Sequence, residues 1–178
     1  SVKKIFNLFD FELIDAIPQN THGGSMRYVI SRKNSHKINT RVDNILATEK
    51  KNKLDDMVSC IKFKKDCENS KKRIFDELTK FKEKGNKICG YAATAKSTTL
   101  LNYCNLNSSI IDFICDTTFE KIGTFSPGKH IPIVSIDEFH KRNPDVAYLF
   151  AWNHKDEIFA KEKKFIKNGG KWFSHVPL

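Results

Sequence analysis

The segment from Lys87 to Tyr103 constrains the fold of this chain more than any other feature. It begins with a short apolar run, Ile88 to Tyr91, which is typical of a buried strand. Small residues follow from Ala92 to Ala95, and the pattern then becomes helical, with Leu100 and Leu101. A strand, a tight turn of small residues and a helix form the first unit of a nucleotide-binding α/β layer.

The turn in this segment has the chemistry of an anion site. The unpaired N–H groups and the positive dipole end of a helix start attract negative charge. Small side chains let a phosphate approach the backbone, while Thr94, Ser97 and Thr98 offer hydroxyls and Lys96 a cation. The dinucleotide fingerprint G-x-G-x-x-G is absent, because position 92 is Ala. A plain strand–helix connection, whose small residues serve only packing, stays open as an alternative.

Charge and cysteine usage narrow the class of protein. The 178 residues carry a formal net charge of +10, which favours nucleic acid, an acidic membrane face or a phosphorylated small molecule as partner. A biased, Lys-rich composition with solvated lysines explains the same charge.

The five cysteines have no C-x-x-C spacing, so they predict neither a metal site nor a disulfide framework, and they fit a reducing cytoplasm. No signal peptide or long apolar run is present, which predicts a soluble protein with no membrane partner.

The front of the chain reads as a helix, a hairpin and a helical segment. Residues 2–9 fit the end of a helix, and residues 11–17 and 25–31 read as two antiparallel strands. Two helices are expected within residues 42–84, joined near residues 52–64. One helix and two strands cannot bury a core by themselves, so this front segment must pack on the rest of the chain or on a further domain.

From residue 88 onward, strands and helices alternate. Strands are expected at residues 88–91, 110–115, 130–134, 146–152 and 171–176, with helices that include residues 135–142 and 153–167. This alternation predicts an α/β fold with a Rossmann-like, mostly parallel sheet flanked by helices. Such sheets bind ligands beyond the carboxyl ends of their strands, where the strand order reverses. The candidate site is therefore formed by the loops at residues 90–97, 116–130 and 152–154.

Three features of these loops bear on function. Asp116 lies where such folds place a carboxylate that accepts ribose hydroxyls, although it fits a turn cap as well. The loop from Thr117 to Lys129 is too long for a plain connection. His154 fits either a ligand contact or a surface residue at a helix start.

Several motifs, taken in order, resemble those of one family. They are Thr21–Arg27, Gly90–Tyr103, Asp116–Thr118 with Lys121, Phe125–Ile133, Phe150–His154, Glu157–Ile158 and Gly169–Trp172. The ordered set is similar to the C-terminal domain of the SAM-dependent sugar C-methyltransferases, over about residues 20 to 178.

The resemblance implies a three-part enzyme: a zinc-binding Cys-rich segment, a SAM-binding methyltransferase core and the Rossmann-like domain. Its substrate is a nucleotide-linked keto-deoxysugar, typically thymidine diphosphate-linked, used in carbohydrate biosynthesis. A base removes a proton next to the ketone, and the enolate takes the methyl group from SAM. The zinc segment and the SAM loop are absent here, so we expect a C-terminal fragment, inactive alone, whose partner is the enzyme's own N-terminal core. The base and the SAM contacts are expected upstream, so no catalytic or metal residue is assigned.

The same resemblance divides the chain and names substrate contacts. Residues 1–33 are expected to end the methyltransferase core, residues 34–85 to form a helical connector, and residues 86–178 to form the Rossmann-like nucleotide-sugar-binding domain. The residues expected to meet the diphosphate or sugar are His22, Gly23, Gly24, Ser25 and Arg27. The anion cradle and the crevice are expected to include Gly90, Tyr91, Ala93, Lys96, Ser97, Thr98, Asn102, Asp116, Lys121, Ser126, His130, Trp152, Asn153 and His154. Ala92 departs from the glycine that is commoner in the family.

Two other classes of function stay open on the residues alone. The net charge and the Lys-rich helices also fit a basic module that binds nucleic acid or a partner protein. A dinucleotide-dependent oxidoreductase is the third class, and the missing glycine fingerprint argues against it.

Overall fold

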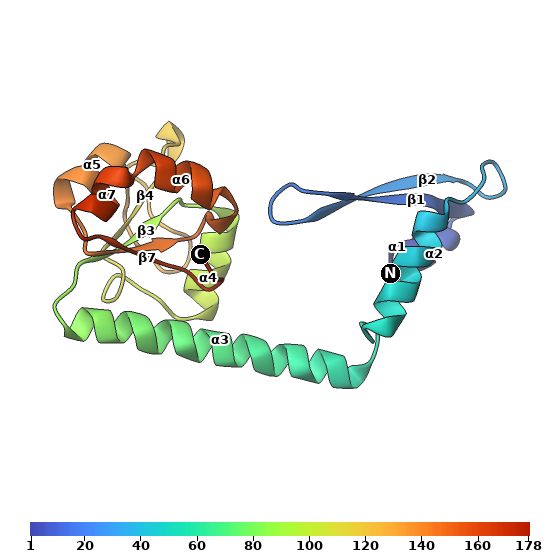
Figure 1. The fold of residues 1–178 in the computed structure, drawn as a ribbon, viewed down its shortest axis with the longest axis horizontal. Helices are drawn as coiled ribbons and strands as arrows, with labels where there is room; N and C mark the ends of the chain where they lie inside the picture. The colour runs from blue at the N-terminus through green and yellow to red at the C-terminus, as the bar shows by residue number, and fades with distance from the viewer. The chain divides into compact units, whose positions relative to one another are not determined.

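The computed structural model describes residues 1–178, which separate into two units, Ser1–Lys65 and Asp66–Leu178. The boundary falls within the long helix α3, Met57–Glu83. Figure 1 labels the elements of both units. Each unit is described by itself below.

The first unit is built on an antiparallel hairpin, as the sequence predicts. Strand β1 (Phe11–Gln19) pairs with β2 (Ser25–Arg32). Helix α1 (Val2–Asn7) precedes the hairpin, and α2 (Thr40–Lys51) packs on β1. A register shift between Leu13 and Asp15 is the mark of a β-bulge, which re-aims side chains along the strand. The predicted β-hairpin is therefore confirmed.

The core of the first unit is small. Its buried apolar side chains are Leu13 and Ala16 from β1 and Val42 from α2. Helix α1 has no buried residue at all. Three apolar side chains are too few to hold a unit of this size, which agrees with the expectation that the front segment must pack on something else.

A five-stranded parallel sheet organises the second unit (Figure 1). Its spatial order is β5-β4-β3-β6-β7, and every neighbouring pair is parallel. The strands are β3 (Ile88–Tyr91), β4 (Phe113–Cys115), β5 (Ile133–Val134), β6 (Val146–Leu149) and β7 (Lys171–Phe173). The predicted Rossmann-like sheet is thus confirmed.

Helices cover both faces of this sheet, and alternate strand residues point to each. On one face, α3 and α4 (Ala95–Tyr103) pack with Ile88, Ile114 and Tyr148. On the other face, the neighbouring strand residues Cys89 and Leu149 pack in a second cluster. The helices of that second face are α5 (Ile136–Arg142), α6 (Lys155–Lys161) and α7 (Lys163–Lys167). Two buried clusters on opposite faces are what a parallel sheet in an α/β protein requires.

Two predicted strand starts are wrong, for a local reason. Ile110 and Ile111 are buried, as a strand pattern suggests, but both of their amides donate to the Asn107 carbonyl in a turn. Strand β4 therefore begins only at Phe113. Strand β5 likewise begins only at Ile133, rather than at residue 130.

The predicted helix over residues 153–167 is wrong in its continuity. The structure has a 3-10 turn, Trp152–His154, and then α6 and α7, which are separated at Glu162. Glu162 is buried, and its carboxylate accepts hydrogen bonds from distant side chains that fix it in place.

The joint between the two front helices is shorter than predicted. Helix α3 begins at Met57, so the joint with α2 is only residues 52–56. The long loop over residues 117–129 contains a 3-10 turn, Phe119–Lys121, and its Phe125 forms an antiparallel bridge with Pro132. None of the helices combines the length and the apolar character needed to cross a lipid bilayer.

Candidate site at the carboxyl edge of the parallel sheet

The strand order reverses between β3 and β6. The chain passes from β3 to β4 and β5 on one side, and then returns to β6 on the other side of β3. In open α/β sheets, ligands bind beyond the carboxyl ends of the strands at such a reversal. Here those ends are Tyr91 and Leu149.

Three residues that the sequence singles out meet at this reversal. Lys96, in the first turn of α4, donates from Nζ to Asn153 Oδ1 at 2.7 Å. The same Nζ lies 4.9 Å from the centre of the Trp152 ring, within the range of a cation–π contact. The turn after β3 and the turn after β6 are thereby joined by a cation at the carboxyl edge.

The start of α4 is capped by its own side chains. Thr94 Oγ1 accepts from the Ser97 amide at 3.1 Å, and Ser97 Oγ donates to the Thr94 carbonyl at 2.6 Å. Thr94 is therefore the N-cap of α4: its hydroxyl satisfies the Ser97 amide, while the Ser97 hydroxyl returns a hydrogen bond to the Thr94 backbone. Ala92 precedes them with a φ of 74°, in the left-handed region that favours glycine.

Asp116 ties the exit of β4 to the turn after β3. Its carboxylate accepts from the Ala93 amide at 2.6 Å and from the Thr118 amide at 2.8 Å. Lys121 Nζ lies 3.4 Å from the same carboxylate and donates to the Ala93 carbonyl at 2.9 Å. Burial acts to raise the pKa of Asp116, but the hydrogen bonds from Thr118 and Ala93 and the charge of Lys121 outweigh it and lower that pKa. These contacts describe an ionised turn cap, and a role toward a ribose stays a prediction.

Two pockets flank the turn after β3. The first, about 280 Å³, lies among the ends of β3 and β4 and the start of α6, and its lining includes Tyr91, Asp116 and His154. The second, about 260 Å³, lies between the start of α4 and the long loop. Five predicted residues line this second pocket: Ala93, Ser97, Thr98, Lys121 and Ser126. Both volumes lie just below the range of about 300–1,000 Å³ that is typical of small-molecule sites, so each pocket suits one part of a ligand rather than a whole one.

Other predicted residues support the packing around these pockets. Gly90 is buried in β3, where an added Cβ would lie 2.6 Å from Phe150 Cε2. Asn102 Nδ2 donates to the Pro127 carbonyl at 3.0 Å and thus holds the long loop against α4. Ser126 Oγ accepts from the Ile131 amide inside the loop. His130 is exposed in the same loop.

The remaining predicted contacts lie together in the first unit. His22, Gly23 and Gly24 form the loop between β1 and β2, and all three have positive φ values. Ser25 and Arg27 follow in β2, and Arg27 Nη2 donates to Gln19 Oε1 at 3.4 Å across the hairpin. All five residues are exposed in the first unit, so no part of this unit covers them. Their contact with the diphosphate or sugar stays a prediction.

One buried network near the first pocket was missed from the sequence. The Tyr91 hydroxyl donates to Glu162 Oε1 at 2.8 Å, and His140 Nε2 lies 2.7 Å from Glu162 Oε2. Burial, followed by the hydrogen bond and the charge of Glu162, raises the pKa of Tyr91. No local signal marks Glu162, because an acidic residue in a helical pattern reads as solvent-exposed.

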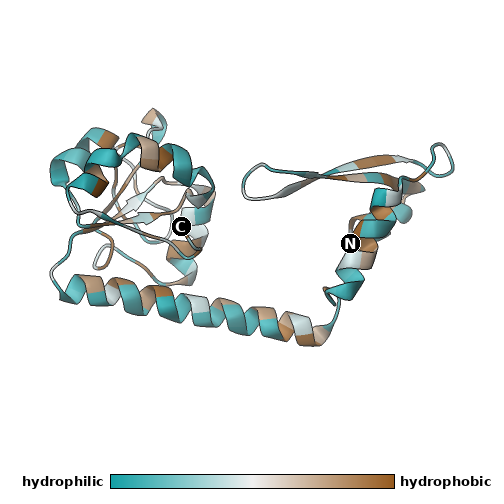
Figure 2. Ribbon diagram, viewed as in Figure 1, coloured by the Kyte–Doolittle hydropathy of each residue, from teal (hydrophilic) through white to brown (hydrophobic).

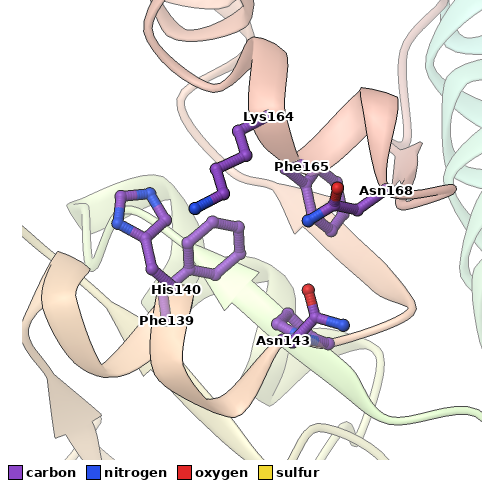
Figure 3. A pocket seen from close by; sticks show the side chains of 7 residues that line it. Phe139, His140, Asn143, Lys164, Phe165 and Asn168 are labelled. Atoms are coloured by element: carbon purple, nitrogen blue, oxygen red, sulfur yellow. The ribbon is translucent and has the colours of Figure 1, made fainter.

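A third, small pocket of about 40 Å³ lies beside this network, between α5 and α7. Figure 3 shows His140 and Lys164 on one side of it and Asn143 and Asn168 on the other. Its size suits a water molecule or two rather than a substrate. Across the whole structure, no three His, Cys, Asp or Glu side chains are grouped as a metal site requires.

Comparison with known proteins adds to this geometry. Residues 20–177 match the family described as the C-methyltransferase C-terminal domain. The chain is also 29% identical, over 99% of its length, to the C-methyltransferase NovU of Streptomyces niveus. The chain spans 42% of the length of that relative.

Proposed function

Because this chain belongs to the C-methyltransferase C-terminal domain family, we propose that it binds the substrate of a methyltransferase that C-methylates a nucleotide-linked keto-deoxysugar. The observation that carries the proposal is the contact of Lys96 with Asn153 and Trp152 where the strand order reverses. A cation, helix N–H groups and two pockets meet at one sheet edge. This is the arrangement that α/β sheets use to hold phosphorylated ligands.

The diphosphate is the part of the ligand that these residues suit best. Lys96 and Lys121 bring two ammonium groups close to the turn after β3: Lys96 follows it in α4 and donates to Asn153, and Lys121 donates to the Ala93 carbonyl of the turn. Ala95, Ser97 and Thr98, at the start of the nine-residue helix α4, line the second pocket, so the positive end of the helix dipole lies beside it. We propose that the diphosphate lies above this turn, and that the sugar and the nucleoside extend into the neighbouring pockets. Thymidine diphosphate is the nucleotide we propose.

The residues of this chain do not fit a SAM site, so SAM is assigned to another part of the full-length protein. The turn after β3 lacks the glycine fingerprint, and the space at Gly90 is filled by the Phe150 ring rather than open to a ligand. When bound, SAM supplies the methyl group. We propose that the methyltransferase core, together with a zinc-binding segment, precedes this chain in the full-length protein.

The surface of the first unit supports contact with such a core. Ile5, Leu8 and Phe9 are 54%, 80% and 69% exposed. Figure 2 shows hydrophobic residues on α1 and along the hairpin strands. Contiguous exposed apolar side chains mark protein contact surfaces. We propose that residues 1–33 belong to the methyltransferase core, that residues 34–85 connect it to the sheet, and that residues 86–178 hold the nucleotide sugar.

The cysteines support the compartment that we propose, the cytoplasm. All five are unpaired, and Cys89, Cys104 and Cys115 are buried. Free thiols persist where the environment is reducing.

Calorimetric titration tests the proposed ligand class. The full-length protein is titrated with thymidine diphosphate, with a thymidine diphosphate-linked keto-deoxysugar and with NAD. Saturable binding of the first two and none of NAD is expected. A gel shift with single- and double-stranded DNA is the control, because the net charge alone favours binding that falls steeply with salt. A salt-sensitive DNA shift without nucleotide-sugar binding contradicts the proposal and favours the basic binding module.

A further inference from the structure

His175 lies at the carboxyl edge of the sheet, two residues after the end of β7. Its Nδ1 is 3.3 Å from the Tyr148 hydroxyl, and the two rings stack at 6.3 Å with an interplanar angle of 14°. Its carbonyl accepts from Arg73 Nη2 at 2.9 Å. Tyr148 of β6 thus contacts the half-buried imidazole, and Arg73 of α3 fixes the backbone of the same residue. No sequence motif marks His175.

The contact with Tyr148 decides which imidazole nitrogen carries the proton. Tyr148 is fully buried, and His175 Nδ1 is the one side-chain partner of its hydroxyl. Burial raises the pKa of Tyr148, so the phenol keeps its proton. A buried hydroxyl that donates to nothing destabilises the fold. We therefore assign the hydrogen bond as Tyr148 donating to Nδ1, which leaves the proton of the imidazole on Nε2.

The imidazole of His175 is uncharged at neutral pH. Burial lowers its pKa, and the positive charges of Arg73 and Lys96 lower it further. An uncharged imidazole with Nδ1 occupied offers one donor, Nε2–H, to a ligand.

Trp152 joins His175 to the proposed site. Lys96 Nζ lies 4.9 Å from the centre of the Trp152 ring, and the His175 ring meets the same indole nearly perpendicularly at 6.4 Å. The ammonium of Lys96 and the imidazole of His175 thus contact one tryptophan at the strand-order reversal. Nδ1 of His175 is already occupied by the Tyr148 hydroxyl, and an ammonium has no acceptor, so both side chains can offer only N–H donors to a ligand. Together they favour an anionic oxygen.

We propose that His175 is a further substrate-binding residue, which donates from Nε2 to a phosphoryl oxygen of the diphosphate beside Lys96. Tyr148 is a positioning residue that fixes the tautomer and the ring plane. This inference rests on the proposed function, since it assigns one more residue to the same site and identifies the diphosphate as the group it contacts.

The test is titration of the full-length protein with thymidine diphosphate. His175→Leu is expected to weaken binding about 10- to 100-fold, the range for one hydrogen bond to a charged group. His175→Gln, whose amide keeps an N–H near the position of Nε2, is expected to recover most of that loss. His36→Leu, an exposed histidine of the first unit, is the matched control and is expected to bind as wild type does.

The positioning role has its own readout. Tyr148→Phe is expected to weaken binding in the wild-type background and to add no further loss in the His175→Leu background. Thermal unfolding of every variant shows that it is folded, and if His175→Leu does not fold, the Gln and Phe variants decide the question.

The outcomes separate this inference from the proposed function. Wild-type protein that does not bind thymidine diphosphate overturns the proposed function. Wild-type binding that His175→Leu leaves unchanged, or that Gln fails to restore, overturns the role of His175 alone.

Discussion

Replacement of Glu162 by Leu is expected to destabilise the second unit by about 2 kcal/mol. The carboxylate is 3% exposed and accepts two hydrogen bonds, from Tyr91 at 2.8 Å and from His140 at 2.7 Å. In the variant, the buried Tyr91 hydroxyl loses its acceptor, which costs about 1–3 kcal/mol. His140, with a side chain that is 51% exposed, recovers water, so its loss adds little. Removal of a buried charge offsets part of the total.

Urea unfolding followed by tryptophan fluorescence measures this effect. Both tryptophans, Trp152 and Trp172, lie in the second unit, and the Trp172 ring is 5.3 Å from that of Tyr91. The matched control is Glu157→Leu, in helix α6, which ends just before Glu162. Glu157 is 63% exposed and pairs with Lys161 at 2.7 Å, so its loss is expected to cost less than about 0.5 kcal/mol. Equal free energies of unfolding for the Glu162 and Glu157 variants would refute the reasoning.

Three further substitutions have expected outcomes. Ala92→Gly relieves a left-handed φ of 74° and is expected to raise the free energy of unfolding by about 1 kcal/mol. A lower free energy of unfolding than that of wild type, measured by urea unfolding, would contradict this. Gly90→Ala places a Cβ 2.6 Å from Phe150 and is expected to cost about 1–3 kcal/mol by overpacking, which a thermal melt indistinguishable from wild type would disprove. The lowered pKa of Asp116 stabilises the fold above the ordinary carboxyl pKa of about 3.9, and that contribution disappears as pH falls through the lower folded-state pKa. The difference in free energy of unfolding between wild type and Asp116→Asn should therefore become smaller as the pH is lowered. A difference that stays constant down to pH 2 would count against a lowered pKa of Asp116.

Local patterns were sufficient to predict the sheet and the ends of several helices. The predicted helix over residues 135–142 begins at Ser135, and in the structure Ser135 caps α5, since its Oγ accepts from the Glu138 amide at 3.3 Å. The alternation of strands and helices after residue 88 gave the parallel sheet, because a parallel connection needs a crossover. The rule for strand ends also brought Lys96 and Asn153 to one edge, although they lie 57 residues apart.

The errors occur where a distant contact decides the local structure. Glu162 interrupts the last helix because its carboxylate meets Tyr91, 71 residues earlier in the chain. The neighbours of Gly90 are the Phe150 and Ile114 side chains, which no local pattern reveals, and its contact with a ligand stays a prediction. His175 lies in the short segment after the last strand, and only its contacts with Tyr148 and Trp152 mark it as a candidate site residue.

An NMR titration of this chain with thymidine diphosphate tests the central claim most directly. If the carboxyl edge holds the diphosphate, the amide shifts that change on binding should cluster at residues 93–98 and 152–154. The same titration of Lys96→Ala should require about tenfold more ligand, as expected for loss of one charged hydrogen bond. Shifts that follow the lysines of α3 instead, or no saturable change at all, would contradict the account.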